Sequence, residues 1–163
     1  MKIRWIGGIA LLGMFVGACG SAPPPPPPVI TPVTVACSEQ WVHMPMLITF
    51  PTSGSQLDYQ NREILQELVA SAQARNDIRR VRVEGHTDTC GNELNNMILS
   101  QQRAESVRSE LVQMGVPFEV VDVQGLGSTQ PRANENCGSH QQISEQTNRR
   151  VEFSLLVCRA GSY

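Results

Sequence analysis

Residues 81–104 read VRVEGHTDTCGNELNNMILSQQRA and predict a strand, a turn and a helix in direct succession. Charged and apolar side chains alternate over residues 79–84, which is typical of a strand with one face in water. A glycine-flanked turn follows and carries the acidic Asp88, whereas the next helix carries Arg103. A carboxylate and a guanidinium held on neighbouring elements favour recognition of a ligand over catalytic turnover.

Similar patterns predict the other elements of the fold. Short apolar or alternating runs predict strands at residues 46–50, 118–124 and 151–157. Apolar residues at helical spacing over residues 57–72 predict a first helix. The order is therefore βαβαβ, then a long loop over residues 125–147, then a last strand. This order predicts a two-layer α/β sandwich.

The second predicted helix carries an apolar stripe and ends before Gly115 and Pro117. Its apolar positions recur at helical spacing, which is typical of a face that packs in the core. They are Leu94, Met97, Ile98, Ala104, Val107, Leu111 and Met114. The stripe contains no cofactor-binding motif, so no cofactor is predicted.

Two motifs of the chain match the pattern of a known family. The first comprises Gly85, His86, Thr87, Asp88, Gly91, Asn96, Leu99, Ser100, Arg103 and Ala104. The second is NRRVE at residues 148–152. Over residues 46–158 the chain thus resembles the OmpA-like domain shared by OmpA, MotB and Pal, the peptidoglycan-associated proteins of bacterial envelopes. The resemblance implies a mixed four-stranded sheet with the last strand antiparallel between the first two.

The resemblance also implies a ligand and the residues that bind it. Asp88 and Arg103 occupy the ligand-binding positions, with Thr87, Asn96 and Arg150 as neighbours. The ligand is the diaminopimelate of the peptidoglycan stem peptide, which carries an ammonium and a carboxylate on one carbon. Asp88 can accept from the ammonium, and Arg103 can present its planar fork to the carboxylate from the rim of the turn. The alternative is structural: the two residues pair with each other, or Asp88 supports the helix start.

The segment after the first strand departs from the family pattern. Phe50 is followed by PTSGS at residues 51–55, where the family usually offers an acidic or amide residue. We therefore expect one wall of the pocket to differ.

Four cysteines lie beyond residue 36. An even number in an exported chain favours two disulfides, and the sequence alone allows three connectivities. In the fold that the resemblance implies, the end of the last strand lies beside the start of the first, which pairs Cys37 with Cys158. The same fold places Cys90 near the loop that contains Cys137, so these two form the second predicted disulfide.

The N-terminal residues 1–18 are typical of an export signal. Two basic residues precede an apolar run at residues 5–16 that is too short for a stable membrane span. The small residues before Cys19 resemble a lipobox, which predicts a lipidated cysteine; the alternative is an ordinary cleaved signal. Gly20 follows, not the aspartate that resembles an inner-membrane retention signal, so the outer membrane is favoured. Lipid at one cysteine would anchor the chain there.

Residues 19–36 are predicted to be the lipidated N-terminus and a proline-rich linker, and residues 37–163 to be the globular domain. Six consecutive prolines at residues 23–28 favour a semi-rigid polyproline II spacer.

Removing two of the thirteen basic residues with the signal leaves eleven arginines against fifteen acidic residues, a net charge of −4. Such a charge argues against nucleic-acid binding. No lysine remains, so attachment to the wall is expected to be non-covalent.

The sequence predicts a binding protein rather than an enzyme. His86, Asp88, Cys90 and Cys137 are candidate zinc ligands of a cell-wall hydrolase, but H-x-D-x-C alternates along extended chain and no HExxH or CxxC motif supports the site. No metal is therefore predicted. A further alternative, compatible with wall binding, is a structural subunit of a Tol-Pal, stator or secretion assembly.

Overall fold

The computed structural model describes residues 37–135, 137 and 146–160. The predicted signal segment, Cys19 and the proline-rich linker lie outside these residues. Among the helices of the described residues, none has the length and apolarity needed to cross a membrane.

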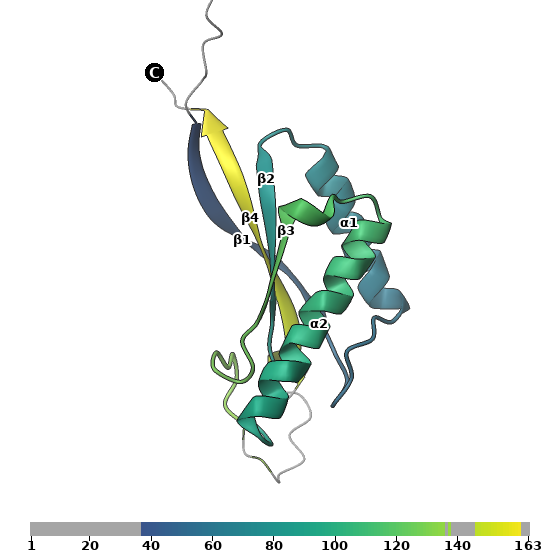
Figure 1. Ribbon diagram of the computed structural model, residues 1–163, viewed down its shortest axis with the longest axis vertical. Helices are drawn as coiled ribbons and strands as arrows, with labels where there is room; N and C mark the ends of the chain where they lie inside the picture. Colours follow the sequence, from purple (N-terminus) through teal and green to yellow (C-terminus); the bar gives the residue numbers. More distant parts are fainter. Residues whose placement is uncertain (1–36, 136, 138–145, 161–163) are drawn as a thin grey trace, which may run out of the picture. The chain divides into compact units, whose positions relative to one another are not determined.

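A four-stranded sheet forms one layer of the domain (Figure 1). Its strands are β1 (Cys37–Thr49), β2 (Ile78–Gly85), β3 (Val121–Gly125) and β4 (Arg150–Ala160), in the order β1-β4-β2-β3. Strand β4 runs antiparallel to both β1 and β2, and β2 runs parallel to β3. The predicted mixed sheet, with the last strand between the first two, is confirmed.

Two helices form the second layer. They are α1 (Tyr59–Gln73) and α2 (Glu93–Gln113), and both lie on the same side of the sheet in Figure 1. Alternate residues of the strands point toward the helices. These residues are apolar and form the core between the layers. It contains Ile48, Val81, Val83, Val151, Phe153, Leu155 and Val157 from the sheet, and Leu65, Leu68, Val69, Ala104, Val107 and Leu111 from the helices.

Two strand boundaries differ from the prediction. Strand β1 begins at Cys37 instead of residue 46, because it pairs with β4 from Cys37↔Ala160 to Thr49↔Arg150. Cross-strand pairing thus extends the strand well beyond its apolar run. Residues Phe118–Val120 form a 3-10 turn, η1, and not the start of a strand. Strand β3 begins where pairing with β2 begins, at Val121↔Val81.

The closest approach between the layers lies at the ends of β2 and β3. A Cβ atom added to Gly85 would lie 2.1 Å from the carbonyl oxygen of Ser100, and one added to Gly125 would lie 2.5 Å from the backbone nitrogen of Gln101. Real Cβ atoms do not approach backbone so closely, so both positions require glycine. Helix α2 therefore crosses the strand ends at Ser100 and Gln101.

The prediction that the whole apolar stripe of α2 is core is wrong for its first turns. Leu94, Met97 and Ile98 are 67%, 40% and 50% exposed. The reason is the crossing point, because residues before Ser100 lie beyond the ends of β2 and β3 and have no sheet to cover. Met97 instead lies against Gly127, where an added Cβ would be 2.9 Å from its sulfur.

The structure contains both predicted disulfides. Cys37–Cys158 joins the start of β1 to the C-terminal end of β4, with Cα atoms 5.3 Å apart. Cys90–Cys137 joins the turn after β2 to the loop before β4, with Cα atoms 5.5 Å apart. The two bridges therefore lie at opposite ends of β4.

Candidate ligand-binding site

A cavity of about 450 Å³ lies where β2 ends and α2 begins. Its walls come from the segment after β1, the turn between β2 and α2, the first turns of α2, and the second disulfide. The lining residues are Thr52, Ser53, Thr87, Asp88, Cys90, Gly91, Asn92, Asn95, Asn96, Leu99, Arg103 and Cys137. The structure thus brings together four of the five predicted ligand-binding residues. The segment after Phe50, whose sequence departs from the family pattern, forms one wall.

Arg103 is buried beneath the cavity, and the expectation that it lies at the rim of the turn is wrong. Its side chain is 0% exposed. Nε donates to the carbonyl oxygen of Gly54 at 2.8 Å, Nη1 to that of His86 at 2.9 Å and Nη2 to that of Pro51 at 3.0 Å. These three bonds join the segment after β1 to the turn after β2, so Arg103 is part of the scaffold of the cavity.

The charge of Arg103 survives this burial. Loss of solvent lowers the pKa of the guanidinium to about 10, and the nearby Asp88 carboxylate opposes this shift. The side chain is therefore cationic at neutral pH. A guanidinium has five N–H donors, and three of them bond the carbonyl groups of Gly54, His86 and Pro51.

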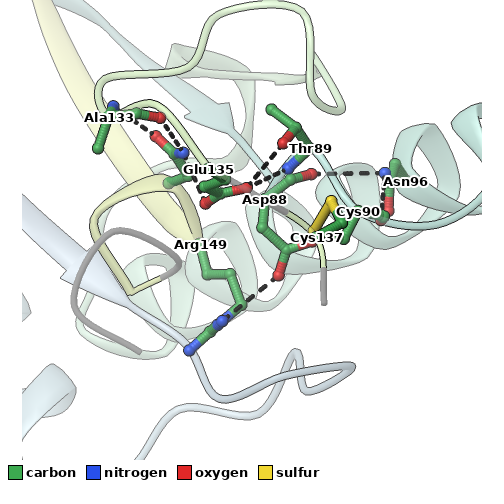
Figure 2. The surroundings of a disulfide bond; sticks show 9 residues. Asp88, Thr89, Cys90, Asn96, Ala133, Glu135, Cys137 and Arg149 are labelled. Atoms are coloured by element: carbon green, nitrogen blue, oxygen red, sulfur yellow. Dashed lines mark hydrogen bonds and ion pairs between the residues drawn. A yellow bond between two sulfur atoms is a disulfide. The ribbon is translucent and has the colours of Figure 1, made fainter. Parts of the chain in front are cut away.

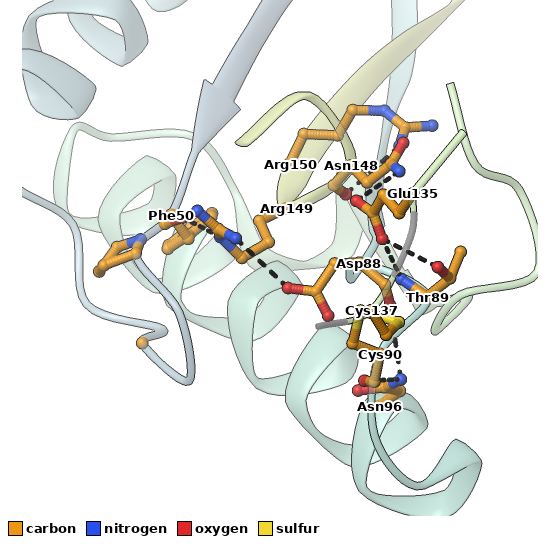
Figure 3. Close-up of polar contacts among 12 residues, drawn as sticks. Phe50, Asp88, Thr89, Cys90, Asn96, Glu135, Cys137, Asn148, Arg149 and Arg150 are labelled. Carbon is orange, nitrogen blue, oxygen red and sulfur yellow. Dashed lines mark hydrogen bonds and ion pairs between the residues drawn. A yellow bond between two sulfur atoms is a disulfide. The ribbon is translucent and has the colours of Figure 1, made fainter. Parts of the chain in front are cut away.

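Asp88 forms an ion pair with Arg149. Within the described part of the chain it forms none with Arg103. Nη1 of Arg149 lies 3.4 Å from Oδ2 of Asp88, as Figure 3 shows. Nε of Arg149 donates to the carbonyl oxygen of Phe50 at 3.1 Å. Both partners are shielded, with side chains 6% and 14% exposed. Sequence reasoning missed Arg149 as a residue of this site.

Arg150, predicted as a ligand neighbour, points away from the cavity and does not line it. It is the first residue of β4, and successive residues of a strand point to opposite faces. Its guanidinium pairs with Glu152, two positions on, and donates to the carbonyl oxygen of Gln130 at 3.0 Å. Figure 3 shows the two neighbouring arginines diverging. The alternation in NRRVE was the signal that could have separated them.

Thr87 offers the cavity an unsatisfied hydroxyl group. The residue is 2% exposed, and its Oγ1 has no hydrogen-bond partner among the described residues. Its backbone N–H donates to the carbonyl oxygen of Gly127 at 2.9 Å, which fixes the position of the side chain. A buried polar atom without a partner is unfavourable, so this hydroxyl favours a polar ligand group in the cavity.

Asn96 holds the turn in shape. Its Nδ2 donates to the carbonyl oxygens of Asp88 at 3.4 Å and Cys90 at 3.1 Å, as Figure 2 shows. Helix α2 begins beside it, where the side chain of Asn92 caps the backbone N–H of Asn95. Free N–H groups at a helix start attract anions.

Three of the four zinc ligands considered from the sequence, Asp88, Cys90 and Cys137, line the cavity, and His86 does not. Cys90 and Cys137 are bonded to each other, so neither supplies a thiolate. His86 lies against Glu152, with 4.0 Å between Nε2 and Oε1, and does not line the cavity. Burial and the neighbouring Arg150 lower the pKa of His86 to about 4.

Comparison with known proteins agrees with this α/β fold. The model of the OmpA family matches residues 49–145, more than half of the chain. This chain belongs to the OmpA family. The outer-membrane lipoprotein YfiB of Pseudomonas aeruginosa is 38% identical over 100 residues, which are 60% of this chain and 57% of that protein. The probable lipoprotein YiaD of Escherichia coli is 36% identical over 114 residues, 70% of this chain and 50% of that protein. The match thus spans about half the length of these relatives.

Solved structures show the same fold. The crystal structure of the peptidoglycan-associated lipoprotein from Burkholderia pseudomallei superposes with a TM-score of 0.57 at 27% identity, over 69% of this chain and 89% of that one. The periplasmic domain of MotB superposes with a TM-score of 0.56 at 19% identity, over 66% of this chain and 57% of that one.

Proposed function

We propose that this chain is a non-catalytic outer-membrane lipoprotein that binds peptidoglycan non-covalently through the diaminopimelate of the stem peptide. The observation that carries the proposal is the cavity at the start of α2. It combines the Asp88 carboxylate, the buried Arg103 guanidinium and the unsatisfied Thr87 hydroxyl. The name of the Burkholderia neighbour, a peptidoglycan-associated lipoprotein, supports peptidoglycan as the polymer that is bound.

Asp88 is assigned to the ammonium of diaminopimelate. Its pair with Arg149 uses Oδ2, so the ammonium is assigned to Oδ1. Nδ2 of Asn96 donates to the backbone carbonyl oxygens of Asp88 and Cys90. These hydrogen bonds hold the turn, and with it the Asp88 carboxylate, in place before the ligand arrives. A preorganised partner of this kind lowers the entropy cost of binding.

Arg103 and the start of α2 are assigned to the carboxylate of diaminopimelate. The three bonds of Arg103 to backbone carbonyls leave two of its N–H donors for the ligand. The Thr87 hydroxyl and the backbone N–H groups at the helix start are further donors. A fixed guanidinium with neighbouring neutral donors suits a planar carboxylate.

The proposed anchor and linker precede the domain along the chain. Residues 1–18 serve as the signal, Cys19 carries the lipid, and residues 19–36 link it to the domain that begins at Cys37. Strand β1 starts there and, over 13 residues, spans about 40 Å to the segment that lines the cavity. The cavity therefore lies at the end of β1 that is opposite Cys37.

Binding to isolated Gram-negative sacculi tests this function. We expect the exported chain, made soluble by Cys19→Ser, to sediment with sacculi and to be released by free diaminopimelate. Asp88→Asn should lower affinity about thirty-fold or more, because it leaves the ligand ammonium without its charged partner. Asp122→Asn is the matched control, since Asp122 also pairs with an arginine, Arg80, but lies at a distance from the cavity. Equal sedimentation of Asp88→Asn and the parent would reject the pocket.

A second candidate function is that of a subunit in an envelope assembly of the Tol-Pal, stator or secretion type. The exposed apolar residues Leu94, Met97 and Ile98 favour it, because they form one face of α2 beside the cavity. A photo-crosslinker at Ile98 should then join the chain to one envelope protein in cells, whereas one at the exposed Tyr59 of α1 should not. Equal labelling at both positions would count against this candidate.

A further inference from the structure

The carboxylate of Glu135 lies behind the turn that carries Asp88. Its Oε2 accepts from the backbone N–H of Thr89 at 2.6 Å and from the Thr89 hydroxyl at 2.9 Å (Figure 2). Thr89 follows Asp88 directly, so this pair of bonds fixes the backbone on one side of the proposed ammonium ligand.

Glu135 is itself held from the other side by Asn148. Nδ2 of Asn148 donates to Oε1 of Glu135 at 2.6 Å and to the carbonyl oxygen of Ala133 at 2.7 Å. Oδ1 of Asn148 accepts from the backbone N–H groups of Arg132 at 2.7 Å and Ala133 at 3.0 Å. Asn148 is 0% exposed, so a buried, fully bonded amide sets the position of Glu135.

The Cys90–Cys137 disulfide joins the same two segments. Cys90 follows Thr89, and Cys137 lies two positions after Glu135, so the covalent bond and the carboxylate bonds act in parallel. Figures 2 and 3 show the disulfide beside Asp88 and Glu135. Both cysteines also line the cavity.

The charge of Glu135 adds to that of Asp88. Oxygen atoms of the two carboxylates lie within 4.8 Å of each other. Arg149 compensates Asp88, and Thr89 and Asn148 donate to Glu135, which makes the proximity of two negative groups tolerable. The combined potential favours a cation at Asp88.

We propose that Glu135 is a positioning residue for ligand binding, and that the Cys90–Cys137 disulfide keeps it behind the Asp88 turn, so that tight peptidoglycan binding requires the oxidised pair. The proposal rests on the function proposed above. A dithiol reductant would reverse the effect: it supplies two electrons and two protons, the S–S bond breaks, two thiols form, and the dithiol becomes a disulfide.

The test compares sacculus binding of the exported Cys19→Ser chain with that of two variants in the same background. Glu135→Gln keeps the size of the side chain and removes its charge, and Cys90→Ser/Cys137→Ser removes the tether. Each should lower affinity about tenfold, the change expected when one hydrogen bond to a charged group is lost. Dithiothreitol should lower the affinity of the parent and leave that of Cys90→Ser/Cys137→Ser unchanged.

Two controls separate positioning from stability. Cys37→Ser/Cys158→Ser removes the disulfide at the far end of β4, which closes the longer loop, and should leave sacculus binding unchanged at a temperature where circular dichroism shows a folded chain. Glu67→Gln on the exposed side of α1 should do the same. Hydrogen exchange of the Thr89 amide should be faster than in the parent in Glu135→Gln and Cys90→Ser/Cys137→Ser, and unchanged in both controls.

The outcomes separate this inference from the function on which it rests. If the parent binds sacculi and both site variants bind equally tightly, the inference is overturned and the function stands. If the parent does not bind sacculi, the proposed function fails. The hydrogen-exchange rate of the Thr89 amide then tests by itself whether Glu135 and the disulfide position the turn. Faster exchange in both site variants would support positioning of the turn, and parent-like exchange would overturn it.

Discussion

Arg103 combines two roles that a single substitution cannot separate. Its guanidinium carries the positive charge of the cavity and also satisfies the carbonyl oxygens of Pro51, Gly54 and His86. A buried acceptor left without a donor costs about 1–3 kcal/mol. Loss of sacculus binding in an Arg103 variant would therefore reflect the scaffold as much as the ligand, which makes Asp88 the cleaner probe.

We expect Arg103→Ala to lower the free energy of unfolding by about 2–4 kcal/mol, because several carbonyl groups lose their donor at once. Arg103→Lys should also destabilise the chain, since an ammonium cannot reproduce the fork that reaches three carbonyls. Urea unfolding followed by circular dichroism measures both. Arg62→Ala, at a half-exposed pair with Glu110, should change little. An Arg103→Ala chain as stable as the parent would rule out the scaffold role.

His86 should make the domain acid-sensitive. Burial and Arg150 hold the pKa of the folded imidazole at about 4, whereas the unfolded side chain titrates near its ordinary value of 6.5. Between these values the unfolded chain binds the extra proton, so stability is complete above pH 6.5 and falls as the pH drops toward 4. The loss approaches about 3 kcal/mol at pH 4. Urea unfolding at pH 7 and pH 5 should show the fall in the parent and not in His86→Gln, while the exposed His43→Gln behaves like the parent.

At the scale of elements, the contact of α2 with the ends of β2 and β3 sets the shape of the site. It places Ser100 over Gly85 and thereby fixes Arg103, one turn further along, beneath the cavity. The same contact leaves the first turns of α2 beyond the sheet, where Asn95, Asn96 and Leu99 line the cavity. The two glycines therefore position the site without lining the cavity.

Gly85→Ala should push α2 away from the sheet, because its Cβ would lie 2.1 Å from the carbonyl oxygen of Ser100. We expect a loss of stability of about 1–3 kcal/mol or more, and weaker sacculus binding in the fraction that folds. Gly115→Asn is the control: this glycine is required by its φ of +92° with open space around it, and asparagine tolerates that conformation. Parent-like stability of Gly85→Ala would contradict the tight crossing.

At the scale of the whole domain, we expect Cys37–Cys158 to affect mainly stability and Cys90–Cys137 to affect ligand binding as well. Cys37–Cys158 closes nearly the whole described domain, with a sequence separation of 121, whereas Cys90–Cys137 closes a loop with a separation of 47. The first lies far from the cavity and the second forms part of its wall. A longer closed loop restrains the unfolded chain more.

We expect Cys37→Ser/Cys158→Ser to lower the free energy of unfolding by up to about 5 kcal/mol, the upper estimate from loop-closure entropy. Cys90→Ser/Cys137→Ser should cost up to about 4 kcal/mol by the same estimate. Denaturant unfolding without reductant measures both, and the order of the two losses should be the reverse of the order of their effects on sacculus binding. The same order in both measurements would mean that binding follows global stability.

The sequence by itself determined the elements and their order. Alternation at residues 79–84, the glycines of the turn and the helical spacing after it are local patterns, and each is settled by a few neighbouring residues. The two motifs implied the strand order and both cysteine pairs, and the structure contains them. They also predicted Thr87, Asp88, Asn96 and Arg103 at one binding site, and these four residues line the same cavity.

Tertiary structure alone decided how those residues are used. The three bonds of Arg103 cross 17, 49 and 52 positions, and the pair of Asp88 with Arg149 crosses 61. Local periodicity reaches only about one or two turns of helix, so it could not show that Arg103 is buried or that Arg149, and not Arg150, faces Asp88. The same limit hid the exposure of Leu94, Met97 and Ile98, because a helical pattern does not record where the sheet beneath the helix ends.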